Sequence, residues 1–123
     1  MNSSPLLHHT VGKWMLKKFS LNYRTHALFC TGDSNVASSY TIRDGFILIK
    51  IKPLGDYSLC FSPNCRDLFA EFQFRQISTQ NDIIQVIESL EYVEYKNCGL
   101  EEASASKCEV MLYAQQFEYQ RVN

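Results

Sequence analysis

The chain has 123 residues, of which 46% are hydrophobic, 13% aromatic and 20% charged, and its formal net charge is -1. A chain of this length can bury roughly two thirds of its unfolded surface in one core, so the composition excludes a disordered protein and requires no disulfide or metal scaffold. We expect a single domain over residues 1–123.

The cysteines indicate a reducing compartment. They are odd in number and scattered through the chain, which favours buried thiols over an extracellular disulfide framework and predicts a cytoplasmic location. They are Cys30, Cys60, Cys65, Cys98 and Cys108. No apolar stretch has the length of a membrane span, and His8 and His9 interrupt the apolar run near the N-terminus. We therefore expect neither an export signal nor a membrane partner.

Residues 5–19 fit two structures. Ser4 followed by Pro5 is typical of a helix start, and apolar residues recur at helical spacing. These residues are Leu7, Val11, Trp14 and Met15. Lys18 falls inside that apolar stripe, while Gly12 and the β-favouring run over 14–23 suit a strand. The second reading is favoured: a flexible or frayed segment over residues 1–10 that leads into a first strand.

A β-hairpin is predicted next. Asp44 and Gly45 readily adopt the positive φ values of a type I′ turn, and they separate the β-favouring runs 40–43 and 46–52. Pro53 cannot donate a ladder hydrogen bond and is expected to end the second strand. Residues 57–61 alternate between apolar and small polar side chains, which predicts a further short strand.

The second half is predicted to contain one clear helix between strands. Residues 68–76 alternate with a period of two and are read as a strand. Ser78 and Thr79 offer capping hydroxyls to a helix whose apolar stripe is Ile83, Val86, Ile87 and Leu90. Residues 92–96 are read as a strand, 97–99 as a turn, and 99–107 as a loop or short helix. Residues 109–121 then predict a long strand at the centre of the sheet.

Together these elements predict an α+β fold. We expect a curved, mainly antiparallel β-sheet of about five to six strands, with one main α-helix packed on one face. Such sheets carry unrelated activities, so the fold does not fix a function.

No catalytic, metal-binding or cofactor-binding residue is assigned. His26, Cys30 and Asp33 have suitable types for nucleophilic catalysis, but on one strand His26 and Cys30 would lie about 13 Å apart, which is too far for a hydrogen bond. Cys60 and Cys65 bracket a turn and do not form a zinc signature. Isolated glycines give no phosphate-binding loop.

Cations and aromatic rings alternate in one basic segment near the N-terminus, which is a weak sign of nucleic-acid binding. The segment contains Lys13, Trp14, Lys17, Lys18, Tyr23 and Arg24. A dedicated nucleic-acid binder normally has a strongly positive domain, and this chain has a pI of about 6.3. Nucleic acid is therefore an unlikely partner.

Charge is distributed unevenly, at +4 over residues 1–60 and -5 over residues 61–123. Packing of one half on the other would neutralise this difference, and an acidic run often serves only solubility. Alternatively, one acidic surface docks a basic protein, with tyrosines as anchors. The residues of that predicted surface are Glu88, Glu91, Tyr92, Glu94, Tyr95, Glu101 and Glu102.

Two functional hypotheses follow. The first is a non-enzymatic protein-binding module, a small intracellular inhibitor or immunity-type protein that neutralises a toxin or nuclease by direct binding. The second is a domain that binds a small ligand or nucleic acid on a concave aromatic face of the sheet. Its predicted lining is Trp14, Tyr57, Phe61, Phe72 and Phe74. Both a monomer and a homodimer through an uncovered sheet edge are compatible with the sequence.

Overall fold

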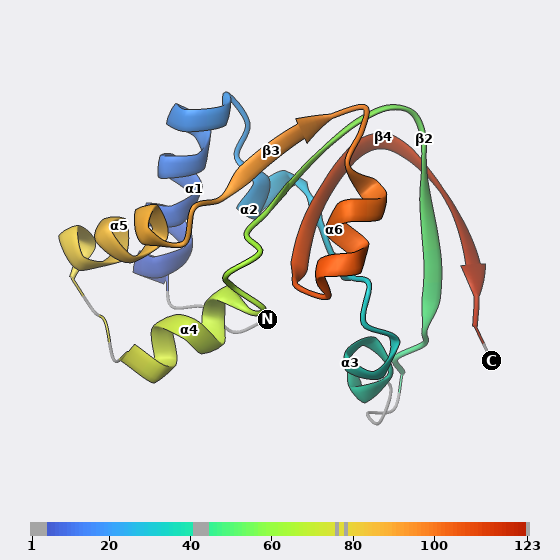
Figure 1. Cartoon of the computed structure of the whole chain (residues 1–123), viewed down its shortest axis with the longest axis horizontal. Coiled ribbons are helices and arrows are strands. Elements are labelled where there is room, and N and C mark those ends of the chain that lie inside the picture. Colours follow the sequence, from blue (N-terminus) through green and yellow to red (C-terminus); the bar gives the residue numbers. More distant parts are fainter. Residues whose placement is uncertain (1–4, 41–44, 76, 78, 123) are drawn as a thin grey trace.

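The computed structural model describes residues 5–40, 45–75, 77 and 79–122 (Figure 1). Its helices are α1 (Pro5–Phe19), α2 (Tyr23–His26), α3 (Ser34–Ser39), α4 (Leu68–Arg75), α5 (Gln80–Ser89) and α6 (Leu100–Ser106). Its strands are β1 (Leu28–Thr31), β2 (Ile49–Phe61), β3 (Val93–Lys96) and β4 (Glu109–Arg121).

The four strands form one antiparallel sheet in the order β1-β4-β2-β3. β4 pairs with β1 over residues 109–112 and with β2 over residues 110–121, with a bulge in the β2 pairing between Leu54 and Tyr57. β3 pairs with β2 over residues 58–61 and forms an outer edge of the sheet. The α+β class, the antiparallel pairing and the central position predicted for 109–121 are confirmed.

The predicted numbers of strands and helices were wrong. The described residues contain four strands and six helices, where five to six strands and one main helix were expected. Two segments read as strands, 14–19 and 68–75, are helical, and this accounts for much of the difference.

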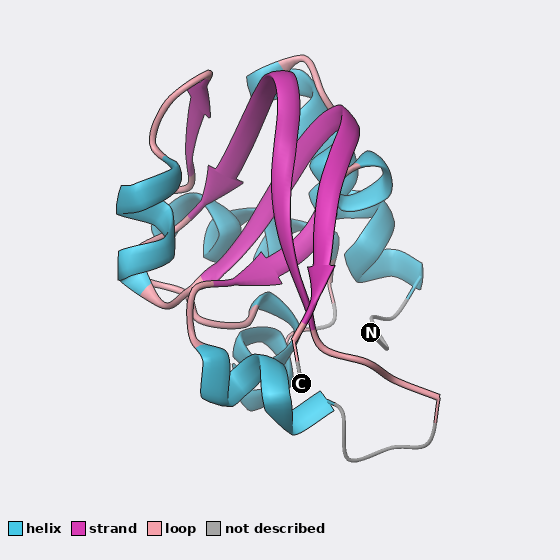
Figure 2. Cartoon of the chain, turned by 90° about the vertical axis from the view of Figure 1, so that its right-hand side faces the viewer, coloured by secondary structure: helices cyan, strands magenta, loops and turns pink. Residues whose placement is uncertain are grey.

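Helices pack on both faces of the twisted sheet (Figure 2). On one face, Cys60 and Met111 join a core cluster with α1, α2, α4 and α5. On the other face, Leu59 and Leu112 pack with Ala103 of α6. Because neighbouring residues of a strand point to opposite faces, β2 and β4 contribute to both clusters in alternation.

α1 begins at Pro5, so the expected frayed start does not extend over residues 5–10; residues 1–4 lie outside the described part. Leu7, Val11 and Met15 follow one another at a spacing of four residues and are buried. That spacing places the three side chains on one helix face, where they join the core cluster with α5. The helical stripe therefore prevailed over the β propensity of the segment.

α4 shows the same competition between two periods. Leu68 and Phe72 lie four residues apart and are both buried, as a helix requires, although residues 68–75 also alternate as a strand would. Asp67 accepts a hydrogen bond from the Ala70 N–H, which satisfies a donor in the first turn of the helix.

The predicted hairpin falls partly outside the described residues, which omit 41–44 and with them Asp44 of the expected turn. Tyr40 ends α3 and does not belong to a strand, and β2 begins only at Ile49. Pro53 does not end β2, contrary to expectation. At Pro53 the strand pairs with Phe117 of β4, and β3 joins β2 only from Ser58, so that part of β2 has one described neighbour and tolerates a proline.

The predicted helix after Thr79 is confirmed. The Thr79 hydroxyl accepts a hydrogen bond from the Asp82 N–H, and Ile83, Val86 and Ile87 are buried. The strand predicted at residues 92–96 is β3, and the short-helix alternative for 99–107 is α6.

Candidate functional site

Four exposed carboxylates flank the short edge strand β3. Glu88 lies in the last turn of α5 and Glu91 follows the C-cap residue of that helix, whereas Glu101 and Glu102 lie in the first turn of α6. Since α5, β3 and α6 follow one another along the chain, the two pairs stand at opposite ends of β3. Acidic residues at the start of a helix favour its dipole, so Glu101 and Glu102 also have a stabilising role. Glu88, at a helix end, gains nothing from that effect.

The other three predicted surface residues have structural contacts. Tyr92 is only 3% exposed and cannot serve as a surface anchor. Glu94 accepts a hydrogen bond of 2.6 Å from the Tyr23 hydroxyl. Tyr95 stacks on Phe61 with ring centroids 6.2 Å apart, and a hydrogen bond to the Glu102 carboxylate raises the pKa of its phenol. Tyr95 is half-buried, so part of its ring faces outward beside Glu102.

Glu94 belongs to a chain of polar groups that the sequence did not predict. A phenol has one proton, and the Tyr23 hydroxyl donates it to the Glu94 carboxylate. Ser58, whose Oγ lies 2.8 Å from the Tyr23 oxygen, is then the donor of the second hydrogen bond. Burial raises the pKa of Tyr23, which therefore stays protonated and keeps donating to Glu94.

A surface depression of about 560 Å³ lies beside this chain of groups. Its lining comes from β2, β3, β4 and the residues next to them: Asp56, Tyr57, Ser58, Lys96, Asn97, Tyr113 and Gln115. The depression combines carboxylate, ammonium, amide and hydroxyl groups within reach of a ligand. No sequence motif could have located it, because its residues are scattered over three strands and meet only through the sheet register.

Buried Arg24 lies near the partly buried carboxyl of Glu109, a proximity that sequence reasoning also missed. Arg24 is 5% exposed and its guanidinium stands 4.9 Å over the Phe29 ring. Burial and the neighbouring Asp67 raise the pKa of Glu109 to about 7, while Arg24 and the Leu68 N–H oppose that rise. Burial lowers the pKa of Arg24, and the Glu109 charge opposes that change. Arg24 and Glu109 are far apart in the sequence and come near each other only in the folded chain, so no local sequence pattern could have predicted their proximity.

The basic segment does not present a free stacking surface. Lys18 lies 4.9 Å above the Trp14 ring, so this cation and ring contact each other. Tyr23 and Arg24 are buried. Lys13 and Lys17 remain exposed on α1.

The aromatic residues proposed as a concave lining do not share one face. Phe61 is buried on the face covered by α6, whereas Phe72 is buried in the opposite cluster. Trp14 packs at the margin of that opposite cluster and Tyr57 on the α6 side. The Phe74 side chain lies outside the described part.

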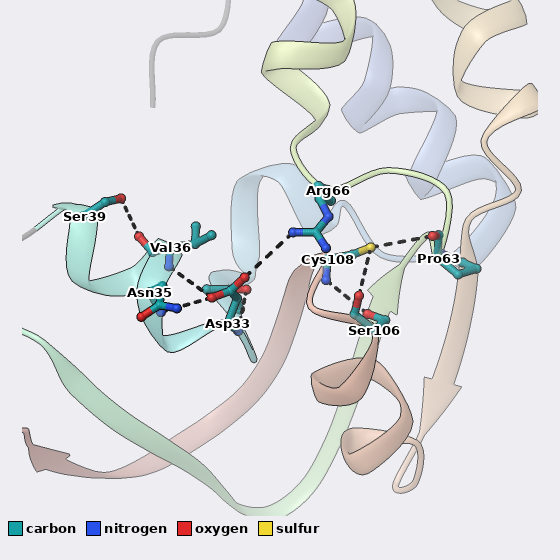
Figure 3. A network of polar contacts seen from close by, with 9 residues as sticks. Asp33, Asn35, Val36, Ser39, Pro63, Arg66, Ser106 and Cys108 are labelled. Carbon is teal, nitrogen blue, oxygen red and sulfur yellow. Dashed lines mark hydrogen bonds and ion pairs between the residues drawn. The ribbon is translucent and has the colours of Figure 1, made fainter.

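Two of the residues considered for nucleophilic catalysis, Asp33 and Cys30, have other partners, and Figure 3 shows those of Asp33. Asp33 caps α3 by accepting hydrogen bonds from the Asn35 and Val36 N–H groups, and it forms an ion pair of 3.8 Å with Arg66. The Cys30 thiol donates to the Val110 carbonyl, and burial raises its pKa to about 11. These contacts hold Cys30 as a protonated thiol at neutral pH.

The cysteines are all free thiols. Cys60 and Cys65 are buried, and burial raises the pKa of both, that of Cys65 to about 11. Within the described residues, no three His, Cys, Asp or Glu side chains gather in a way that could hold a metal ion. His8 and His9 are exposed on α1.

A scan against protein-family models found no match, and neither a search of curated proteins nor a search of solved structures found one. Over the described ranges, none of the helices combines the length and the apolar character needed to cross a membrane.

Proposed function

We propose that this chain is a non-enzymatic protein-binding module, a small intracellular inhibitor or immunity-type protein that neutralises a basic toxin or nuclease by direct binding. The observation that carries the proposal is the acidic edge: strand β3 with exposed Glu88 and Glu91 at one end and exposed Glu101 and Glu102 at the other. The free thiols support a reducing, cytoplasmic location.

Charge and contact area have separate roles at the acidic edge. The carboxylates attract a basic surface over roughly one Debye length, which speeds encounter and disfavours acidic proteins. Affinity then depends on residues that lose contact with water on binding. Val93 is exposed and Tyr95 is half-buried, so both have area left to bury. Tyr95 is already held by Phe61 and Glu102 and loses little conformational freedom on binding.

The test is charge reversal at both ends of the acidic edge. The tagged chain is incubated with nuclease-treated lysate of its source cells, and a protein retained at equal stoichiometry in moderate salt is identified. The variant Glu91→Lys/Glu101→Lys is expected to lose at least about tenfold in affinity for that protein, because two attractive contacts become repulsive. Glu94 is left unchanged because it bonds to buried Tyr23.

The matched control is Asp82→Lys/Glu118→Lys, which makes the same change in net charge at two exposed positions, in the first turn of α5 and on β4, outside β3 and its flanking carboxylates. It should retain the partner nearly as well as the natural chain. Equal loss in both variants would show that only net charge matters, and equal retention would exclude the acidic edge as the binding surface.

A second candidate function is binding of a small polar ligand in the depression beside Ser58. Its volume of about 560 Å³ lies within the usual range for ligand sites, and its lining offers charges of both signs. Ligand-observed NMR with a mixture of polar metabolites tests this function. A true ligand should lose its signal change in Lys96→Ala and keep it in Glu91→Lys/Glu101→Lys.

A further inference from the structure

The hydrogen bonds between β2 and β3 determine which main-chain groups of β3 face outward. The Asn97 N–H donates to the Tyr57 carbonyl at 2.9 Å, and the register continues through Ser58 with Lys96 and Leu59 with Tyr95. In an antiparallel pair, hydrogen-bonded positions alternate with positions that are not. Tyr95 and Val93 therefore turn their main-chain groups toward β2, as Asn97 does. Glu94 and Lys96 turn theirs away from it.

The outer edge of β3 thus presents two N–H donors and two carbonyl acceptors, from Glu94 and Lys96. These residues are separated by about 7 Å along the strand, which is the repeat at which an added strand makes its hydrogen bonds. Figure 1 shows β3 at the margin of the sheet, and the strand order places no described strand beyond it. An extended peptide can satisfy such groups by lying alongside as a further strand.

The side chains around the outer edge of β3 determine which kind of peptide segment can bind there. Val93 and Tyr95 share the face covered by α6, since their partners Phe61 and Leu59 pack against it. Apolar side chains of an added strand would meet them there. The exposed carboxylates at the two ends of β3 would meet cationic side chains.

We propose that the basic partner docks by adding an extended segment, with alternating cationic and apolar residues, as a strand along the outer edge of β3. This inference rests on the proposed protein-binding function and specifies how the same acidic edge is used. Main-chain hydrogen bonds to Glu94 and Lys96 fix the segment, and the flanking carboxylates select its charge.

The experiment uses a fluorescein-labelled decapeptide of alternating lysine and valine as the probe. The control peptide has the same sequence with N-methyl groups on alternate residues, which removes one row of main-chain donors and keeps the charge. We expect the unmodified peptide to bind at least about tenfold more tightly, since several edge hydrogen bonds depend on those donors. In the complex, hydrogen exchange at the Glu94 and Lys96 amides should slow.

Substitution of Lys96 tests the same main-chain hydrogen bonds by removing a donor from β3 instead of from the peptide. In Lys96→Pro the lost N–H points away from β2, so the β2–β3 pairing keeps its bonds and the fold is retained. The variant should bind the unmodified peptide about tenfold more weakly. Lys96→Ala removes the charge and keeps the N–H, so it should bind at least as well as the natural chain. Thermal unfolding of both variants checks the fold.

Equal binding of the two peptides, absence of binding by either, or unchanged affinity in a folded Lys96→Pro variant would overturn strand addition. If the two peptides bind equally and Glu91→Lys/Glu101→Lys weakens both, the acidic edge binds a basic partner through side chains alone, and only strand addition is wrong. If instead the edge binds the peptide but no lysate protein depends on Glu91 and Glu101, the proposed function is wrong.

Discussion

Glu109 makes the stability of this protein depend on pH. Burial raises the pKa of its carboxyl from the ordinary 4.5 to about 7. Between these values the folded chain keeps a proton that the unfolded chain releases, so the free energy of unfolding falls as the pH rises from about 4.5 to about 7. The pKa difference corresponds to about 3 kcal/mol, and the loss is complete above the folded pKa.

Replacing Glu109 with glutamine should remove this dependence, because the amide does not titrate. Urea unfolding at pH 5, 6, 7 and 8 measures it: the natural chain should lose stability across the series, and Glu109→Gln should show a flatter profile. Above about pH 7 Arg24 loses a counter-charge in the variant, so the slope with pH, and not the absolute stability, is the decisive quantity. Parallel profiles would mean that Glu109 is ionised in the folded chain at pH 5.

The Tyr23 hydroxyl is a second sensitive group. It connects Ser58 with the Glu94 carboxylate inside the fold. Tyr23→Phe should lower the free energy of unfolding by about 1–3 kcal/mol, because a hydrogen bond to a charged acceptor is lost. Tyr40→Phe is the matched control, since Tyr40 is exposed, and it should change stability by less than about 0.5 kcal/mol. Similar losses in the two variants, measured by chemical unfolding, would contradict this role.

At the level of elements, the local sequence pattern distinguished helix from strand only where the apolar residues recur with a single period. Residues 80–89 have a capping Thr79 and a single apolar stripe, and they form the predicted helix. Residues 68–75 satisfy both periods. Leu68 and Phe72 lie four residues apart, a spacing that places two side chains on the same face of a helix and also on the same face of a strand. The buried contacts of these two residues with other helices decide for the helix, and those contacts are not visible in a local window.

Parts of the candidate site were predictable for a similar reason. Glu88, Glu91, Glu101 and Glu102 flank β3 because they flank it in the sequence. The burial of Tyr92 was not predictable, since Tyr92 lies in a core cluster to which two segments read as strands, now α1 and α4, contribute. The residues of the depression meet only through the pairing of β2 with β3 and β4.

Gly32 permits a close approach between the β1–α3 turn and α6. A Cβ atom built at this position would lie 2.0 Å from the Ser104 main-chain oxygen of α6. Gly32→Ala should therefore force the β1–α3 turn away from α6 and lower the free energy of unfolding by about 2–4 kcal/mol. Ser34→Ala, at an exposed position in α3, serves as the control in thermal unfolding. An unchanged melting temperature for Gly32→Ala would mean that the turn relaxes without cost.

For the whole molecule, the sheet has two parts that differ in how many strands pair with them and in whether helices pack on their faces. Around residues 110–112, β4 pairs with β1 and β2 at once, and helices pack on both faces. Beyond the bulge, residues 49–54 and 116–121 pair only with each other within the described part, and Ile49 and Tyr119 are 42% and 72% exposed. A two-stranded ribbon with an open face gains little stability of its own.

Amide hydrogen exchange should therefore be faster in this ribbon than in the four-stranded part, because the ribbon can open while the core clusters stay packed. The amides of residues 116–121 should exchange by local opening, and those of residues 110–112 only by global unfolding. Leu59→Ala removes a core side chain and should speed exchange at 110–112 without altering the ribbon. If the ribbon amides slowed or quickened together with the core amides, the sheet would open as one unit, and its two parts would share one stability.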